Sequence, residues 1–101
     1  MARILVAEDA DRDLDEVLLD LAGKAGTPVA IRYVDLFDRL YDRLAEHPAI
    51  GAARPGLGRG IRIGIVTPYI VIYHHDLAAD LVTILRIVHG RRRIDRGLVP
   101  S

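Results

Sequence analysis

Cysteine is absent from this 101-residue sequence. The absence excludes disulfide bonds and metal sites built from thiolates. It also agrees with a protein of the reducing cytoplasm, which is the location that we predict.

A long hydrophobic run is missing as well. The longest apolar stretch, residues 61–73, is broken by Arg62, Gly64 and Pro68, so it falls short of the roughly 20 apolar residues that a membrane-spanning helix needs. Near the N-terminus, acidic residues begin at Glu8, where the apolar segment of a signal peptide would have to continue. We therefore expect neither a signal peptide nor contact with a membrane.

Net charge is also absent, but the charges are unevenly divided along the chain. Residues 1–53 carry six basic and eleven acidic side chains, a net charge of −5, whereas residues 54–101 carry eight and three, a net charge of +5. This division indicates that the second half meets an anionic partner, either a nucleic acid or an acidic protein segment. The protein segment needs less total positive charge, and we expect no direct binding to DNA. Alternatively, the first half only carries a solvated acidic face.

Apolar residues at helical spacing predict two helices in the first half. In residues 9–25, apolar side chains recur every three or four positions from Leu14 onward, and glycines at 23 and 26 end the pattern. Thr27 followed by Pro28 is typical of an N-cap and a first helical residue, so a second helix is expected from there to about Glu46. The short connection predicts an antiparallel helical hairpin.

Three aspartates stand at the start of the first predicted helix: Asp9, Asp11 and Asp13. Carboxylates at this position cap unpaired N–H groups and interact favourably with the helix dipole. We interpret these residues as structural.

Residues rich in β-branched side chains predict three strands in the second half. They span residues 61–66, 69–75 and 81–89, and their short connections indicate an antiparallel meander. On the third strand, strict alternation places Leu85 and Ile87 on one face and Ile84 and Arg86 on the other.

The expected fold over residues 1–101 is a single α+β domain. A short apolar run at residues 3–7 predicts an N-terminal strand, whose neighbour in the sheet the sequence does not select. An N-terminal strand, an α-helical hairpin and a three-stranded antiparallel β-meander then follow one another, with the helices on one sheet face. The other face, which carries Arg62 and Arg86, is expected to be covered by a partner.

The connection at residues 48–60, PAIGAARPGLGRG, is predicted to be a loop. Its glycines lack the spacing of a dinucleotide fingerprint, and no Gly-Lys-Ser/Thr ending of a P-loop follows. We therefore expect no nucleotide cofactor, and we expect the glycines to adopt positive φ where the chain turns. His74, His75 and Asp76 are of metal-binding types, but strand neighbours point to opposite faces, so a polar turn is predicted rather than a metal site.

Five short patterns occur in a fixed order over nearly the whole chain. They are Ala10-x-x-Asp13-Leu14, residues 40–46 followed by Pro48-x-Ile50-Gly51, Arg54-Pro55-x-Leu57-Gly58-x-Gly60-Ile61-Arg62, Pro68-Tyr69-Ile70-x-x-Tyr73, and Ile84-Leu85-Arg86-Ile87-x-His89-Gly90-x-Arg92. In this order they resemble the ParE branch of the RelE/ParE toxin superfamily.

The resemblance implies the toxin of a type II toxin–antitoxin system. Toxins of this branch are associated with the inhibition of DNA gyrase and are neutralised by a ParD-like antitoxin, whose C-terminal segment covers the helices and the sheet. An antitoxin segment with acidic and apolar residues would suit the basic, apolar sheet face and form a hetero-oligomer with the toxin. The predicted target-binding residues are Arg62, Arg86, Arg91, Arg92 and Arg93. The predicted antitoxin-binding residues are Tyr33, Phe37, Tyr41, Ile70 and Ile72.

The RelE branch of the same superfamily implies a competing activity, ribosome-dependent cleavage of messenger RNA. In that case His89 would transfer a proton while Arg62 and Arg86 stabilise the phosphate. Gly90 departs from the ribonuclease pattern, and a net charge of zero is unusual for a protein that binds ribosomes. We therefore predict no catalytic residue and no enzymatic activity. A third alternative is an inactive relative that only binds its antitoxin.

Overall fold

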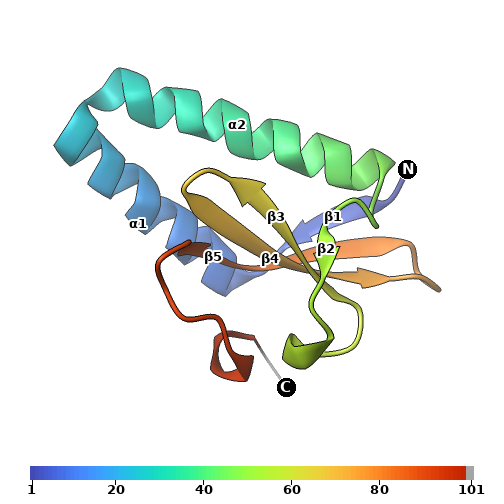
Figure 1. The fold of residues 1–101 in the computed structure, drawn as a ribbon. Helices are drawn as coiled ribbons and strands as arrows, with labels where there is room; N and C mark the ends of the chain where they lie inside the picture. The colour runs from blue at the N-terminus through green and yellow to red at the C-terminus, as the bar shows by residue number, and fades with distance from the viewer. Residues whose placement is uncertain (100–101) are drawn as a thin grey trace.

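A computed structural model describes residues 1–99 as two helices packed against one face of a five-stranded sheet (Figure 1). In chain order the elements are β1 (Arg3–Val6), α1 (Glu8–Ala25), α2 (Thr27–Glu46), β2 (Ala52–Ala53), the 3-10 helix η1 (Pro55–Leu57), β3 (Ile61–Val66), β4 (Tyr69–Asp76), β5 (Leu81–His89) and the 3-10 helix η2 (Arg96–Leu98). The predicted α+β class and its order of strand, helical hairpin and meander are confirmed. Neither helix within residues 1–99 is long and apolar enough to cross a membrane.

The strand order in the sheet is β1-β5-β4-β3-β2. β1 lies parallel to β5, with Arg3 opposite Leu81 and Val6 opposite Ile84, whereas the other neighbours are antiparallel. The tertiary structure therefore selects the last strand as the partner of the first. One prediction was wrong at the other edge, because part of the expected loop pairs with β3 as the two-residue strand β2.

The helical hairpin lies where it was predicted, with one difference at its turn. Gly26, with φ of 94°, precedes α2, and no side chain caps the helix at this point. Thr27 is therefore the first helical residue rather than the N-cap, and Pro28 occupies the first turn. Because glycine tolerates positive φ, the chain reverses here within one residue.

The main core lies between the hairpin and the sheet. Its largest fully buried side chains include Phe37 and Leu44 from α2 and Tyr73 and Ile84 from the sheet. Burial of each large apolar side chain contributes about 1.5–3 kcal/mol. Ala10 is the fully buried residue of α1, so this helix approaches the sheet closely at its start.

A bulge in β5 overturns the predicted strict alternation. Tyr73 lies opposite Ile84, but the preceding residue Ile72 lies opposite Arg86, so Leu85 has no counterpart on β4. The extra residue at the bulge reverses the sheet face to which each following side chain of β5 points. As a result Ile84 and Ile87 both belong to the helix-side core, whereas Leu85 packs in the cluster on the other face.

The second sheet face is partly covered by the chain itself, which corrects the prediction of a face left entirely to a partner. Leu57 of η1 and Leu98 of η2 are buried against Ile61, Ile72 and Val88. Figure 1 shows both 3-10 helices below the sheet, on the side away from α1 and α2. The C-terminal segment folds back because it carries apolar residues that the sheet face can bury.

Candidate functional site

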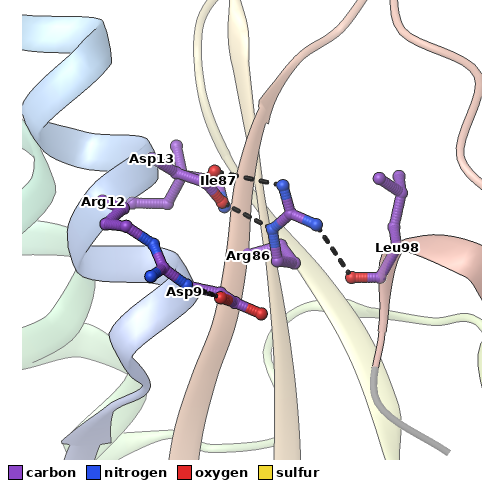
Figure 2. A network of polar contacts seen from close by, with 6 residues as sticks. All are labelled: Asp9, Arg12, Asp13, Arg86, Ile87 and Leu98. Atoms are coloured by element: carbon purple, nitrogen blue, oxygen red, sulfur yellow. Dashed lines mark hydrogen bonds and ion pairs between the residues drawn. The ribbon is translucent and has the colours of Figure 1, made fainter.

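Arg86 is held by an ion pair inside the molecule (Figure 2). Its Nε and Nη2 donate to the two carboxylate oxygens of Asp13 at 2.7 and 3.1 Å, and its Nη1 donates to the Leu98 carbonyl at 3.3 Å. The two charged side chains are only 19% and 14% exposed. The hydrogen bonds to Asp13 raise the pKa of Arg86 despite its burial, so the guanidinium stays charged.

Asp13 also completes the edge of β5. β1 ends at Val6, opposite Ile84, so within residues 1–99 no strand lies beside β5 on this side beyond that point. The Ile87 N–H donates to Asp13 Oδ2 at 2.9 Å, and the carboxylate thus takes the place of a strand carbonyl. The interpretation of Asp13 as a helix-terminus charge missed this role, because the partner lies more than seventy residues away.

Arg62, the second predicted target-binding arginine, anchors a loop. Its Nη1 donates to the carbonyls of Ala49 and Gly51 at 3.2 and 2.8 Å. Both guanidiniums thus bind groups of their own chain, which the prediction of an open basic face did not include. A long, multivalent donor is suited to this task because it can satisfy several carbonyls at once. The role of Arg62 and Arg86 in target binding stays a prediction.

Tyr73 joins Arg62 in fixing the connection between α2 and β2. Its hydroxyl donates to the Pro48 carbonyl at 2.8 Å and accepts from the Gly51 N–H at 3.0 Å. A Cβ on Gly51 would lie 2.4 Å from the Ile63 carbonyl oxygen and 2.5 Å from the Tyr73 hydroxyl. Burial raises the pKa of Tyr73, which keeps the hydroxyl protonated as a donor.

His89 lies apart from both arginine sites. Its ring packs edge-on against Tyr69 with centroids 5.8 Å apart, and its Nδ1 accepts from the Arg91 N–H at 3.0 Å. Arg62 reaches towards the β2 edge of the sheet, whereas Arg86 reaches towards α1. The structure therefore does not bring the three residues of the ribonuclease alternative together.

The arginine run after β5 is exposed to solvent. Arg91, Arg92 and Arg93 are all solvent-accessible. Arg92 lines a shallow hollow together with His89 and three acidic residues of α1: Asp13, Glu16 and Asp20. Its positive charge is thus partly balanced by the acidic helix.

A larger cavity of about 550 Å³ opens on the sheet face away from the helices. It is lined by Leu57, Gly58, Arg59, Ile61, His74, Thr83, Leu85, Arg96 and Val99. Apolar side chains make up much of this lining, two arginines and a histidine lie beside them, and none of the lining residues within 1–99 is an aspartate or a glutamate. We call it the cationic cavity. It combines apolar surface with positive charge.

The residues that supply this charge were not predicted. Arg59 is exposed, and Arg96 donates from Nε to the Gly56 carbonyl at 3.0 Å, which holds the C-terminal segment against the glycine-rich loop. The excess of arginine in the second half was the signal that could have found them. Sequence reasoning favoured Arg62 and Arg86 instead because they lie within strands.

Two of the five predicted antitoxin contacts are unsuitable for direct contact in this structure. Phe37 and Ile72 are fully buried in the two cores of the chain. Tyr33, Tyr41 and Ile70 are partly buried. Phe37 lies on the core side of α2, because helical spacing cannot distinguish a residue at the centre of the apolar stripe from one at its border.

The two tyrosines of α2 have different surroundings. The Tyr33 hydroxyl donates to the Thr67 carbonyl at 3.1 Å, and its ring packs edge-on against Tyr69. The Tyr41 hydroxyl is buried without a hydrogen-bond partner among the described residues. Burial, reinforced by the charges of Asp11 and Asp38, raises the pKa of Tyr41 to about 12.

A second hollow, of about 640 Å³, separates α2 from the outer edge of β3. It is lined by Leu36, Arg39, Leu40, Asp42, Arg43, Ile65, Val66 and Thr67. Leu36 and Ile65 are exposed apolar residues, at 38% and 53%. We call it the α2–β3 groove; the sequence did not indicate it, because its two walls come from distant parts of the chain.

Comparison with known proteins identifies the family. The family model described as the ParE toxin of the type II toxin–antitoxin system parDE matches residues 4–94. The chain belongs to this family. It is a ParE-type toxin of a type II toxin–antitoxin system, and the predicted resemblance is confirmed.

Two relatives agree with this assignment. The toxin ParE3 of Caulobacter vibrioides is 32% identical over 94 residues, which cover 93% of this chain and 92% of that protein. The solved structure of the chromosomal ParDE TA system from P. aeruginosa contains a chain of similar fold, with a TM-score of 0.73 and 22% identity over 88% of this chain and 96% of that one. The two chains thus share a fold at low sequence identity.

Proposed function

We propose that this ParE-type toxin inhibits DNA gyrase in the cytoplasm and that a ParD-like antitoxin neutralises it. The family assignment supports a toxin with an antitoxin partner. The observation that carries the proposal for the target is the cationic cavity, because it combines apolar surface with two arginines and, within residues 1–99, no acidic lining residue.

The cavity and the neighbouring arginine run are the surface proposed to meet gyrase. Arg59 and Arg96 lie at the cavity, while Arg91, Arg92 and Arg93 are exposed on the segment between β5 and η2. Guanidinium groups pair with carboxylates in bidentate geometry, and apolar surface beside them supplies burial. A protein surface with acidic and apolar side chains is therefore the expected counterpart.

The placement of the other basic residues favours this proposal over cleavage of messenger RNA. Acid–base catalysis needs the proton-transfer group and the phosphate-stabilising groups within hydrogen-bond reach of one substrate. His89 is packed on Tyr69, whereas Arg62 and Arg86 are bound to groups at different sides of the sheet. Assembly of a ribonuclease site from these three residues would require these internal contacts to break.

The ParD-like antitoxin is proposed to bind through an acidic and apolar C-terminal segment. One similar chain among the solved structures comes from a ParDE system, which supports an antitoxin of this type. Tyr33, Tyr41 and Ile70 remain proposed contacts because they are partly exposed. Phe37 and Ile72 would support such contacts from within the cores.

Paired assays test the proposed activity. The purified toxin is incubated with DNA gyrase and relaxed plasmid, and in parallel with translating ribosomes. Gyrase inhibition predicts loss of supercoiling or trapped DNA cleavage, with messenger RNA left intact, and His89→Ala should retain this activity. Cuts in messenger RNA that His89→Ala abolishes would establish the ribonuclease instead. Unaffected growth on expression without the antitoxin would identify an inactive relative.

A further inference from the structure

We propose that the outer edge of β1 binds a second copy of this chain, β1 against β1, so that two five-stranded sheets join into one. The inference does not depend on the target or the antitoxin proposed above. Three observations lead to it: an open strand edge, a pairing register that serves both copies equally, and an exposed leucine at the centre of that register.

The outer edge of β1 is open. β1 stands at the end of the strand order, and within residues 1–99 no strand lies beyond it. Just before the strand, the Ala2 N–H donates to the Ala45 carbonyl at 2.8 Å, so the end of α2 closes the edge at that point. The following residues 3–6 present an edge whose backbone donors and acceptors are aligned to pair with another strand.

Hydrogen bonds at both ends of β1 show which of its backbone groups face this edge. The N–H groups of Arg3 and Ala7 donate to backbone carbonyls on the β5 side, at 3.1 and 2.9 Å. Backbone groups of successive residues alternate between the two sides of a strand. The N–H and the carbonyl of Ile4 and of Val6 therefore point outward, where a second strand can bind them.

A two-fold axis at Leu5 pairs every outward group of both copies. Identical edges related by such an axis run antiparallel, so Ile4 of each copy lies opposite Val6 of the other and exchanges two hydrogen bonds with it. An axis at Ile4 would instead place Val6 opposite Ala2, whose N–H is already bound. An axis at Val6 would place Ile4 opposite Glu8, where α1 begins. The edge is thus self-complementary in the Leu5 register.

The side chain at the centre of this register is apolar and exposed. Ile4 and Val6 pack against the main core, so the Leu5 side chain points to the other face of the sheet, where it is 54% exposed. At the axis the two Leu5 residues form a non-hydrogen-bonded pair, whose Cα atoms lie about 4.5 Å apart. Each leucine then covers the other, and the burial of apolar surface on both copies favours association.

The charges near the edge are compatible with a second copy. Arg3 is the charged residue of β1, and the Leu5 register places it opposite Ala7 of the second copy. Glu8 follows Ala7, so along the paired strands the charge nearest to each Arg3 is of opposite sign. The register therefore brings no two like charges directly opposite each other, which would oppose pairing. Two other acids near this edge contact side chains of their own copy: Asp9 contacts Arg12, and Asp80 contacts His75.

Disulfide cross-linking tests the register, because the chain has no cysteine of its own. In the Leu5→Cys variant the two thiols meet at the axis, and a Cα separation of about 4.5 Å lies within the range of disulfide bonds. Mild oxidation should therefore convert this variant into a covalent dimer. Leu19→Cys, at a position on α1 that is 74% exposed, is the matched control and should cross-link at least about tenfold more slowly. Equal rates would overturn the inference.

Sedimentation equilibrium of the purified toxin tests the association without a cross-link. The wild type should pass from monomer to dimer as its concentration rises, and Leu5→Lys should weaken this association by about tenfold or more, since a lysine on an edge strand opposes pairing. Leu19→Lys is the control and should associate within about twofold of the wild type. Thermal denaturation establishes that both variants fold. A wild type that stays monomeric, or two variants that associate equally well, would overturn the inference.

Amide hydrogen exchange identifies the occupant of the edge. The Ile4 and Val6 amides should exchange more slowly as the concentration of the toxin alone rises, because pairing removes them from solvent. The Leu5 amide, which faces β5, should be protected at every concentration. Protection of Ile4 and Val6 that requires the antitoxin would assign the edge to that partner and overturn the second copy as occupant. None of these outcomes bears on gyrase inhibition, so the inference and the proposed function fail separately.

Discussion

Asp13 stabilises a side chain and a backbone group of β5 at the same time. It accepts two hydrogen bonds from Arg86 and one from the Ile87 N–H. Arg12 and Asp9, one turn earlier, form an ion pair as well, but their side chains are 69% and 57% exposed. The two ion pairs differ in burial. Loss of one partner destabilises the fold strongly when the remaining charge is shielded from water, and only weakly when that charge is exposed to solvent.

Asp13→Ala should lower the free energy of unfolding by about 2–4 kcal/mol, because it leaves a half-buried guanidinium and a strand N–H without an acceptor. Urea denaturation measures the change. Asp9→Ala is the control and should cost less than about 0.5 kcal/mol. Equal stability of the two variants would contradict this role of Asp13.

The buried hydroxyl of Tyr41 predicts a loss of stability at alkaline pH. The pKa is about 12 in the folded chain and roughly 10 in an unfolded chain. Between these values the unfolded state releases the phenolic proton while the folded state retains it. The contribution of Tyr41 is therefore fully present below about pH 10 and decreases as the pH rises towards 12.

Tyr41→Phe should make unfolding less dependent on pH in this range. At neutral pH it should leave stability unchanged or raise it, since the hydroxyl has no hydrogen-bond partner among the described residues. Chemical denaturation at several pH values checks both expectations. A marked loss of stability at neutral pH would show that the hydroxyl has a binding partner.

Between the elements, the connection from α2 to the sheet depends on one crowded glycine. Gly51 binds Tyr73 through its N–H and Arg62 through its carbonyl. Strand β2 starts directly after it, so these contacts set where the chain enters the sheet. The loop was recognised in the sequence as glycine-rich, but its anchors on β3 and β4 lie outside the local pattern.

Gly51→Ala should lower the free energy of unfolding by at least about 2 kcal/mol, because the new methyl group would meet the Ile63 carbonyl. Gly56→Ala, in the same connection, is the control, since no atom lies within 4 Å of the added Cβ. Thermal denaturation should separate the two variants. Similar melting temperatures would contradict the crowding at Gly51.

In the molecule as a whole, one face of the sheet serves the packing of the core, and the other face carries the surface of the proposed function. The hairpin closes one face, whereas the other is closed only in part and retains the cationic cavity. The α2–β3 groove lies at the border of the helix layer.

Arg59→Glu combined with Arg96→Glu should abolish gyrase inhibition and leave antitoxin binding intact, because the changes reverse the charge of the cavity. Since Arg96 also donates to the Gly56 carbonyl, retained antitoxin binding shows that the variant is folded. Supercoiling assays and calorimetry measure the two properties. Arg3→Glu combined with Arg32→Glu changes the net charge equally at exposed positions outside the cavity, and it should retain inhibition. Loss of activity in both double variants would indicate a general effect of charge.

The local patterns of the sequence determined the elements of this toxin. Helical spacing placed α1 and α2, β-branched runs placed β3, β4 and β5, and glycines marked turns such as Gly58 and Gly60, which have positive φ. These features depend on neighbours within a few residues, so the chain order of strand, hairpin and meander was readable. The ordered set of five motifs also led to the family.

Only the tertiary structure decided which side chains are free to bind a partner and which are bound within the chain. The bulge at Leu85 shifts the register of two strands, β1 joins β5 across the length of the chain, and the C-terminal segment returns to the sheet. Arg86 and Arg62 thereby receive internal partners, while Arg59 and Arg96 come together at one cavity. Such contacts join residues far apart in sequence, and their energies depend on burial, which no local pattern specifies.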